Sequence, residues 1–389
     1  MGADANGGPA SASTGVGNNV FLTGATGFLG AEIMKRVLAS HPGSRLTLLV
    51  RSSAQESASA RVDKLLARTF GEGEGQRHRT RVDVVDGDIS RPGLGLDPKQ
   101  ADAVRSSVDH VVHCAATVRF DLPYEVARRD NTEGTRHVLA LAEGARSLRR
   151  LDYIGTSYVA GGREGLVLED ELDVGQEFSN SYERTKMEAE TLVRAFAQRH
   201  ATTIHRPSIV VGDSKTGATT SFEGMYQTVS MFKAAYSRGV RVALPADPKT
   251  RVDIVPIDYV VDALFGLMHS PKAIGRAHHL TSGPGYTCEL DELIGIASRL
   301  VQVKQPPYMS LDTYFNYFRP VLRAVIWGKK RKLMLKGEHY MPYGSTKFEF
   351  DKTNTYAGLE GTGITTPHPR DYFEKLLKYQ AKKDQRLEG

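Results

Sequence analysis

The chain has 389 residues, a length that corresponds to two domains or to one large domain with an added lobe. Hydrophobic residues make up 40% and charged residues 25%, a composition that excludes collagen, long coiled coils and wholesale disorder. The longest uncharged apolar stretches, such as 111–118, are far shorter than the ~18 residues of a membrane span. A net charge of +6 does not by itself favour nucleic acid, and we expect no such partner. Two cysteines, Cys114 and Cys288, exclude a disulfide framework and a four-cysteine zinc site.

The first 18 residues are rich in Gly, Ala, Ser and Asn, and they contain neither a basic residue nor an apolar core. They therefore do not form a secretory signal, and we expect a flexible tail at 1–18. Because no targeting signal is found, we expect a cytoplasmic protein.

A glycine-rich turn follows the first predicted strand, at 19–22. An amphipathic helix over 29–38 and an apolar strand over 45–50 complete a strand–turn–helix–strand unit. In such a unit the first glycine permits a tight turn, the second lets the backbone approach a pyrophosphate, and the third lets the helix pack closely on the sheet. The helix N-terminus then faces the anion. The sequence thus predicts a dinucleotide site formed by Thr23, Gly24, Thr26, Gly27, Phe28, Leu29 and Gly30.

The end of the second strand indicates which dinucleotide is bound. An acidic residue there would accept hydrogen bonds from the adenosine ribose, whereas a basic residue neutralises a 2′-phosphate. Arg51 occupies this position, and we therefore expect NADPH. Arg61 is a second candidate for the phosphate, with a solvent-exposed helix position as the alternative.

Strands and helices continue to alternate, with strands at 81–85, 110–114 and 151–154 and a helix at 124–143. This alternation predicts an α/β fold with a doubly wound parallel sheet of the Rossmann type, whose ligand lies at the C-terminal edge of the strands. Four residues at strand ends are placed to contact the cofactor: Asp88 and Ile89 at the adenine, and the small Ala115 and Ala116 beneath the cofactor.

The catalytic candidates follow the strand at 151–154. Tyr182 and Lys186 are four residues apart, so on a helix they lie on the same face. We expect the ammonium to lower the pKa of the phenol and to make it a usable acid, with the Thr156 hydroxyl holding the substrate oxygen. No HExxH motif or Cys/His cluster is present, and we expect no metal.

With these residues in place, the sequence resembles the extended short-chain dehydrogenase/reductase family over 19–380. The resemblance rests on TGATGFLG at 23–30, GDI at 87–89, NTEGT at 131–135 and YERTK at 182–186. The segments at 113–120, 206–217 and 252–261 are similar to the branch of fatty-acyl reductases and thioester reductases, which includes the reductase domains of carboxylic acid reductases.

The resemblance implies roles for individual residues. Tyr182 would be the proton donor, Lys186 would bind the nicotinamide ribose, and Asn131 would brace that lysine. The hydroxyl group aligns with Thr156, with Ser157 as an open alternative because Gly155 stands where relatives often carry serine. The stretch 206–209 would line the nicotinamide side, with Pro207 and Ile209 as its cofactor contacts.

We assign 19–212 to the NADP-binding domain, to which 252–284 returns, and 213–251 with 285–389 to a smaller substrate lobe. The aromatic and Met-rich stretch 219–238 is either a core helix or one wall of an acyl channel. The basic, aromatic stretch 314–336 has three open interpretations: a solvated lid, a dock for an anionic carrier, or a contact with a membrane surface. For the basic helix at 372–386 we prefer a solvated face.

Together these features predict the NADPH-dependent reduction of an acyl thioester, carried by coenzyme A or by an acyl carrier protein, to an aldehyde and, as an open option, on to the alcohol. The alternative is an NADPH-dependent ketone or aldehyde reductase, or a hydroxysteroid-type dehydrogenase, of the same extended family. A nucleotide-binding sensor without catalysis is disfavoured, because Tyr182 and Lys186 are both present.

Overall fold

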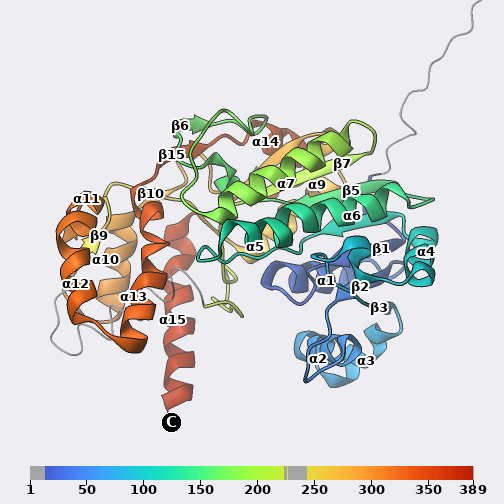
Figure 1. Ribbon diagram of the computed structural model, residues 1–389, viewed down its shortest axis with the longest axis horizontal. Helices are drawn as coiled ribbons and strands as arrows, with labels where there is room; N and C mark the ends of the chain where they lie inside the picture. Colours follow the sequence, from blue (N-terminus) through green and yellow to red (C-terminus); the bar gives the residue numbers. More distant parts are fainter. Residues whose placement is uncertain (1–13, 223–225, 227–242, 389) are drawn as a thin grey trace, which may run out of the picture.

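A computed structural model of the protein describes residues 14–222, 226 and 243–388 (Figure 1). A seven-stranded sheet forms its centre, with the strand order β12-β7-β5-β4-β1-β2-β3. All pairings in this sheet are parallel, which confirms the predicted doubly wound fold. The strands are β1 (Asn19–Thr23), β2 (Arg45–Val50), β3 (Val82–Asp86), β4 (His110–His113), β5 (Arg150–Ile154), β7 (Thr202–Pro207) and β12 (Ala277–Leu280).

Helices cover both faces of the sheet because the strands are apolar on both sides (Figure 1). In β1, Val20 and Leu22 belong to one buried cluster and Phe21 to the other, as the two-residue period of a strand requires. The first cluster includes side chains of α1 (Phe28–Ser40), α2 (Ala58–Phe70) and α9 (Ile257–Met268). The second includes side chains of α4 (Pro98–Ser107), α6 (Gly134–Glu143) and α7 (Ser181–Ala197).

The helix predicted at 124–143 is present but not uniform. It consists of α5 (Tyr124–Arg128), a π-helical turn η2 (Arg129–Glu133) and α6. The wider turn contains the buried Asn131. Insertions of this kind occur often at functional sites.

Short elements join the main helices and strands of this half. They are α3 (Glu72–Arg79), η1 (Pro92–Gly95), η3 (Ser157–Ala160), β6 (Glu164–Val167), β8 (Ile209–Val211), β11 (Ile254–Pro256) and η4 (Pro271–Ala273). The pairing of β12 with β7 places residues 277–280 at the edge of the central sheet.

Most of the remaining elements form a lobe beside the sheet, and β15 (Lys347–Phe350) is a strap back to the sheet half, whereas α14 (Thr353–Leu359) packs on α9 and β12 (Figure 1). The strap is β15, which pairs in parallel with β6. The elements are β9 (Leu244–Pro245), β10 (Arg251–Val252), β13 (Cys288–Glu289), α10 (Leu290–Leu300), β14 (Tyr308–Met309), α11 (Leu311–Thr313), η5 (Tyr314–Phe318), α12 (Arg319–Val325), α13 (Gly328–Glu338), η6 (Met341–Ser345), β15 (Lys347–Phe350), α14 (Thr353–Leu359) and α15 (Pro369–Glu388).

Helix α15 corrects one sequence interpretation. Its first half is not a solvated face, because Tyr372, Phe373 and Leu376 are buried in a cluster with Leu293 of α10. Each such side chain contributes ~1.5–3 kcal/mol when it is fully removed from water. The lobe therefore has a hydrophobic core of its own.

Two predictions fall largely on residues that the structure does not describe. Residues 1–13 of the expected tail lie outside the described residues, whereas Gly15 N donates to Met268 O (2.7 Å) and Ser44 Oγ donates to Gly17 O (2.8 Å). Most of the expected acyl-channel wall, including Met225, Val229, Met231, Phe232 and Tyr236, also lies outside them.

Candidate active site

The glycine turn between β1 and α1 has the shape that a pyrophosphate site needs. Gly24 has φ +79°, and a Cβ on it would lie 2.7 Å from Ala115 N. A Cβ on Gly30 would lie 2.1 Å from Gly24 O, so close packing requires both glycines. Gly27 is different, because it is exposed and the nearest atom to a Cβ there is Gly24 O at 3.2 Å. A side chain at Gly27 would therefore occupy the open space in front of the helix.

The start of α1 offers free backbone donors to this space. Gly27 is its N-cap and makes no side-chain capping bond. The N–H groups of Phe28 and Leu29, in the first turn, have no acceptor within the helix, and the helix dipole adds partial positive charge. Both of these side chains are half-buried, Thr26 is exposed, and the buried Thr23 accepts a hydrogen bond from Ala115 N (3.2 Å). The turn thus presents backbone donors to an anion.

The predicted adenosine side also comes together at the ends of β2 and β3. Arg51 Nη1 lies 3.4 Å from Asp88 Oδ2, and the Arg61 guanidinium donates to Arg51 O. The Arg51 side chain is 67% exposed, so it can contact a ligand. Burial opposes ionisation of Asp88, yet hydrogen bonds from Ser90 and the charge of Arg51 keep the pKa of Asp88 lowered. Ile89 lies beside α6, where a Cβ on Gly134 would be 2.9 Å from its Cδ1.

Small residues follow β4, as predicted. The Ala115 backbone touches the glycine turn, and Ala116 is half-buried beside it. The neighbouring His113 is buried, and burial, followed by the charge of Lys186, lowers its pKa to about 3. His113 is therefore neutral and lies between the hydroxyls of Thr23 (2.7 Å) and Thr135 (3.0 Å).

Tyr182 and Lys186 lie one turn apart near the start of α7, whose N-terminus is capped by the Asn180 side chain. Lys186 is buried, and its Nζ donates to Ile154 O at the end of β5 (2.9 Å). Nζ also lies 4.4 Å from the centre of the Tyr153 ring. Burial lowers the pKa of Lys186 to about 8.

The phenol of Tyr182 differs from the sequence expectation. Burial raises its pKa to about 12, although its hydrogen bond with Thr156 acts in the opposite direction. The prediction that Lys186 lowers this pKa is therefore wrong in direction, because burial of the phenol dominates; the Lys186 ammonium donates to the Ile154 carbonyl. Tyr182 consequently keeps its proton at neutral pH and can donate it.

Of the two candidate hydroxyls, Thr156 is the one beside Tyr182. Thr156 caps η3 by accepting a hydrogen bond from Tyr158 N (3.3 Å), and its Oγ1 lies 3.4 Å from Pro207 O. This contact places the Pro207 carbonyl beside Thr156. Ser157 Oγ is buried and has no hydrogen-bond partner among the described residues.

Asn131 and Ile209 lie at the edge of this cluster. Asn131 Oδ1 accepts from Thr117 N (2.8 Å), and Asn131 Nδ2 donates to Thr185 Oγ1 (3.1 Å). Asn131 therefore holds the residue before Lys186 rather than the ammonium itself. The Ile209 side chain packs against the core of the lobe. Arg206, in the stretch expected to line the nicotinamide, is fully buried and paired with Glu190 (2.6 Å).

An aromatic wall beside Tyr182 was missed by the sequence analysis. The Phe120 ring centre lies 5.5 Å from that of Tyr182, 5.1 Å from that of Tyr340 and 5.4 Å from that of Tyr343. Tyr158 packs edge-on against Tyr343 (4.8 Å). Phe120 ends one of the segments that carry the family resemblance, but nothing in the sequence near 340–343 indicates this contact.

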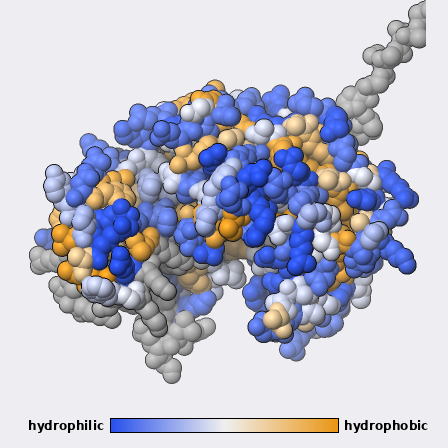
Figure 2. Space-filling view, in the orientation of Figure 1, coloured by the Kyte–Doolittle hydropathy of each residue, from blue (hydrophilic) through white to orange (hydrophobic). Residues whose placement is uncertain are grey.

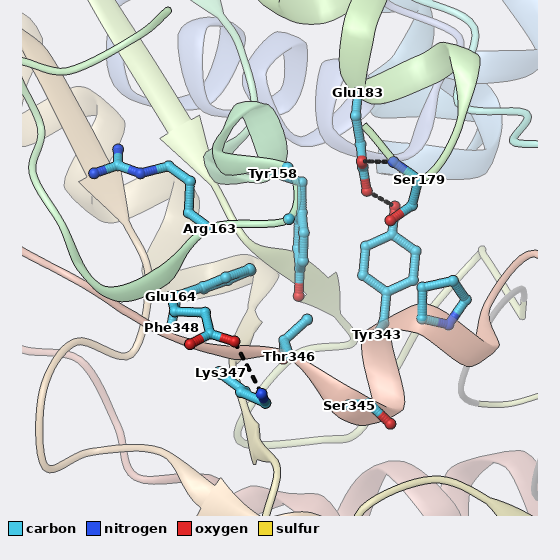
Figure 3. A pocket seen from close by; sticks show the side chains of 13 residues that line it. Tyr158, Arg163, Glu164, Ser179, Glu183, Tyr343, Ser345, Thr346, Lys347 and Phe348 are labelled. Carbon is cyan, nitrogen blue, oxygen red and sulfur yellow. Dashed lines mark hydrogen bonds and ion pairs between the residues drawn. The ribbon is translucent and has the colours of Figure 1, made fainter. Parts of the chain in front are cut away.

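A cavity of about 260 Å³ adjoins this wall (Figure 3). Glu183, the neighbour of Tyr182, faces it and accepts hydrogen bonds from Ser179 N (2.8 Å) and from the Tyr343 hydroxyl. Asn180 Nδ2 donates to the same Tyr343 oxygen (2.9 Å). The cavity is lined by Tyr158, Gly161, Gly162, Arg163, Glu164, Ser179, Glu183, Pro342, Tyr343, Ser345, Thr346, Lys347 and Phe348.

The model of the male sterility protein family, a family of NAD-binding domains, matches residues 22–264, more than half of the chain. The chain belongs to this family. The open space at Gly27, the free backbone N–H groups at the start of α1 and the small residues after β4 fit the nicotinamide dinucleotide that such domains bind.

Individual proteins that are similar to this male sterility family member include fatty acyl-CoA reductases. It is 29% identical over 274 residues to the fatty acyl-CoA reductase wat of Drosophila melanogaster, covering 63% of this chain and 53% of that protein. It is 26% identical over 352 residues to fatty acyl-CoA reductase 1 of Rattus norvegicus, covering 79% of this chain and 68% of that protein. The chain thus spans about half the length of the Drosophila relative.

Among solved structures, the terminal R domain of the myxalamid PKS-NRPS biosynthetic pathway resembles this family member over 96% of this chain and 92% of that domain. The TM-score is 0.77 at 27% sequence identity. The likeness extends over the sheet and the lobe together, and the chain is an extended short-chain dehydrogenase/reductase.

Proposed function

We propose that this chain reduces an acyl thioester to an aldehyde, with NADPH as the reductant. The observation that carries the proposal is a protonated phenol, Tyr182, beside the Thr156 hydroxyl, at the edge of the parallel sheet where the glycine turn also lies. The aromatic wall of Phe120 and Tyr340 makes the space beside this phenol suitable for an apolar acyl group. The fatty acyl-CoA reductases among the relatives support a thioester as the substrate.

The residues of the chain have distinct tasks in this reaction. A bound NADPH supplies the hydride that adds to the carbonyl carbon of the thioester. Thr156 and Tyr182 hydrogen-bond the carbonyl oxygen as negative charge develops on it, and Tyr182 transfers its proton to that oxygen. The hemithioacetal then breaks its C–S bond and gives an aldehyde and a thiol. Lys186, fixed by the Ile154 carbonyl, is the residue that would hold the nicotinamide ribose.

The preference for NADPH over NADH rests on Arg51 and Arg61. Arg51 follows β2, the Arg61 guanidinium reaches from α2 to donate to the Arg51 carbonyl, and the Arg51 side chain is largely exposed. A 2′-phosphate accepts charge-assisted hydrogen bonds from guanidinium groups, and these are about twice as strong as neutral ones. Asp88 pairs with only one side of Arg51, through Nη1, which leaves the rest of that group available.

The test follows NADPH oxidation by the purified chain with palmitoyl-CoA, palmitoyl-loaded acyl carrier protein, free hexadecanal and a matched long-chain ketone, with products identified by mass spectrometry. We expect NADPH oxidation with at least one thioester, together with aldehyde and free thiol in equal amounts. Further reduction of hexadecanal decides between aldehyde and alcohol as the final product. Turnover of the ketone without turnover of either thioester would refute the proposal and favour the ketone-reductase alternative.

A further inference from the structure

A row of exposed apolar side chains lies on the lobe, along η5 and α12. Tyr317 is 72% exposed, Val321 60%, Val325 63% and Trp327 72%, and Phe318 adds a fifth at 47%. These are five of the eleven large hydrophobic residues exposed in the described part of the chain, and all fall within eleven consecutive positions. Val321 and Val325 are four residues apart in α12, which places them on one helix face, and Tyr317 lies in the π-helical turn η5 just before that helix. An apolar row of this size marks a contact surface.

The same segment concentrates the positive charge of the protein. Residues 314–336 contain seven Lys and Arg and no Asp or Glu. Without these seven charges the formal net charge of +6 would become −1, so the excess positive charge of the whole chain lies in this segment. Figure 2 shows hydrophobic residues beside strongly hydrophilic ones on the lobe that carries α12 and α13.

The nearest carboxylate does not cancel this charge. Glu338 is buried and lies 3.0 Å from Arg319 and 3.7 Å from Arg323, so one negative charge faces two guanidinium groups. Arg331, in α13, is half-buried and lies beyond this cluster in the sequence. The surface therefore stays cationic beside its apolar row.

We propose that residues 317–327 together with Arg331, here called the docking surface, bind the surface of an anionic lipid bilayer. Trp and Tyr have an apolar body and a polar tip and suit the headgroup level of a membrane. An apolar helix face flanked by Lys and Arg lies in the plane of that interface, and each basic residue near anionic lipid adds to the attraction. Among the described residues, no helix is long and apolar enough to cross a bilayer.

Lipid explains the surface better than an acidic carrier protein does. An acidic carrier protein would pair with the basic side chains through charge alone. The docking surface also exposes apolar side chains to water, those of Tyr317, Val321, Val325 and Trp327. Docking would bring α13 to the bilayer, and only His339 separates the end of α13 from Tyr340 in the wall beside Phe120. The benefit for an acyl substrate rests on the proposed function, but the docking itself does not.

Trp327 makes the test direct, because it is the only tryptophan in the sequence. The full chain is mixed with vesicles of phosphatidylcholine alone or with 30 mol% phosphatidylglycerol added, and binding is followed by co-sedimentation and by Trp emission. We expect binding to the anionic vesicles, a shift of the emission to shorter wavelength and protection from acrylamide, all weakened by high salt. Failure to bind, or binding with unchanged emission, would overturn the proposal.

A matched pair of variants identifies the contact. The double variant Val321→Ser/Val325→Ser should bind anionic vesicles about tenfold more weakly, because two apolar side chains no longer enter the interface. Val174→Ser, at another exposed valine (53%), should bind as the wild type does, and thermal unfolding checks that both variants are folded. Equal binding by the two would overturn the proposal, as would binding to an acidic carrier protein but not to lipid. None of these readouts depends on thioester reduction.

Discussion

Replacing Tyr182 by Phe removes one hydroxyl and leaves the ring in place. The proposed reaction loses its proton donor, so kcat for thioester reduction should fall by roughly 10²–10⁴, the range for loss of a general acid. The ring retains its contact with Phe120 (5.5 Å between centres), and only the hydroxyl beside Thr156 is removed. The free energy of unfolding should therefore decrease by only about 1 kcal/mol. The glycine turn is untouched, so NADPH affinity should not change.

The assay combines steady-state NADPH oxidation, with an acyl-CoA at saturation, with a fluorescence titration of NADPH in the absence of substrate. Tyr124→Phe is the matched control, because it removes a phenol that donates to Glu188 (2.7 Å) on the same helix, α7. The control should keep the wild-type kcat. If Tyr182→Phe retains more than about a tenth of kcat, the assignment of the general acid is refuted.

Three further changes test other parts of the site. The KM for NADPH should rise as the pH increases through about 8, because burial lowers the pKa of Lys186 to about 8 and the side chain loses its charge above that pH. A KM that is constant from pH 7 to 9 would contradict a charged Lys186 at the ribose. Arg51→Asp should raise the KM for NADPH at least about tenfold and leave that for NADH little changed, since only NADPH carries the 2′-phosphate; equal effects on both cofactors would remove Arg51 from the phosphate site. Tyr343→Phe should lower the free energy of unfolding by about 1–3 kcal/mol in a urea titration, because the buried carboxylate of Glu183 loses a hydrogen-bond donor. Restored stability in the double variant Glu183→Gln/Tyr343→Phe would support this cause. An unchanged urea midpoint for Tyr343→Phe would contradict it.

The cofactor-binding part of the site could be predicted from the sequence because the residues that indicate it are close together in the chain. The turn from Thr23 to Gly30 lies within eight consecutive residues, and the strand before it and the helix after it follow from hydrophobic periodicity. Strand β2 has the predicted bounds, and β12 rejoins the sheet where expected. Tyr182 and Lys186 are likewise related by helix spacing alone.

The substrate side of the site could not be predicted from the sequence because it depends on contacts between residues that are far apart in the chain. Nothing in the local sequence indicates that Tyr343 bonds with Glu183 or that Tyr340 packs against Phe120. The pKa of Tyr182 was mispredicted for a related reason. Helix spacing shows that Lys186 is near, but only the fold shows that its Nζ points to the Ile154 carbonyl and that burial dominates.

The pairing of β15 with β6 has a consequence for the order in which the protein is assembled. Lys347 meets Glu164 across 183 positions, and Tyr343 meets Glu183 across 160. The glycine turn closes within its own segment, and contacts that are local in sequence form before those that need long loops to close. During synthesis, the dinucleotide half can therefore take shape while the carbonyl-facing half still awaits the residues after 340. The two halves of the chemistry can then be completed at different times from one polypeptide.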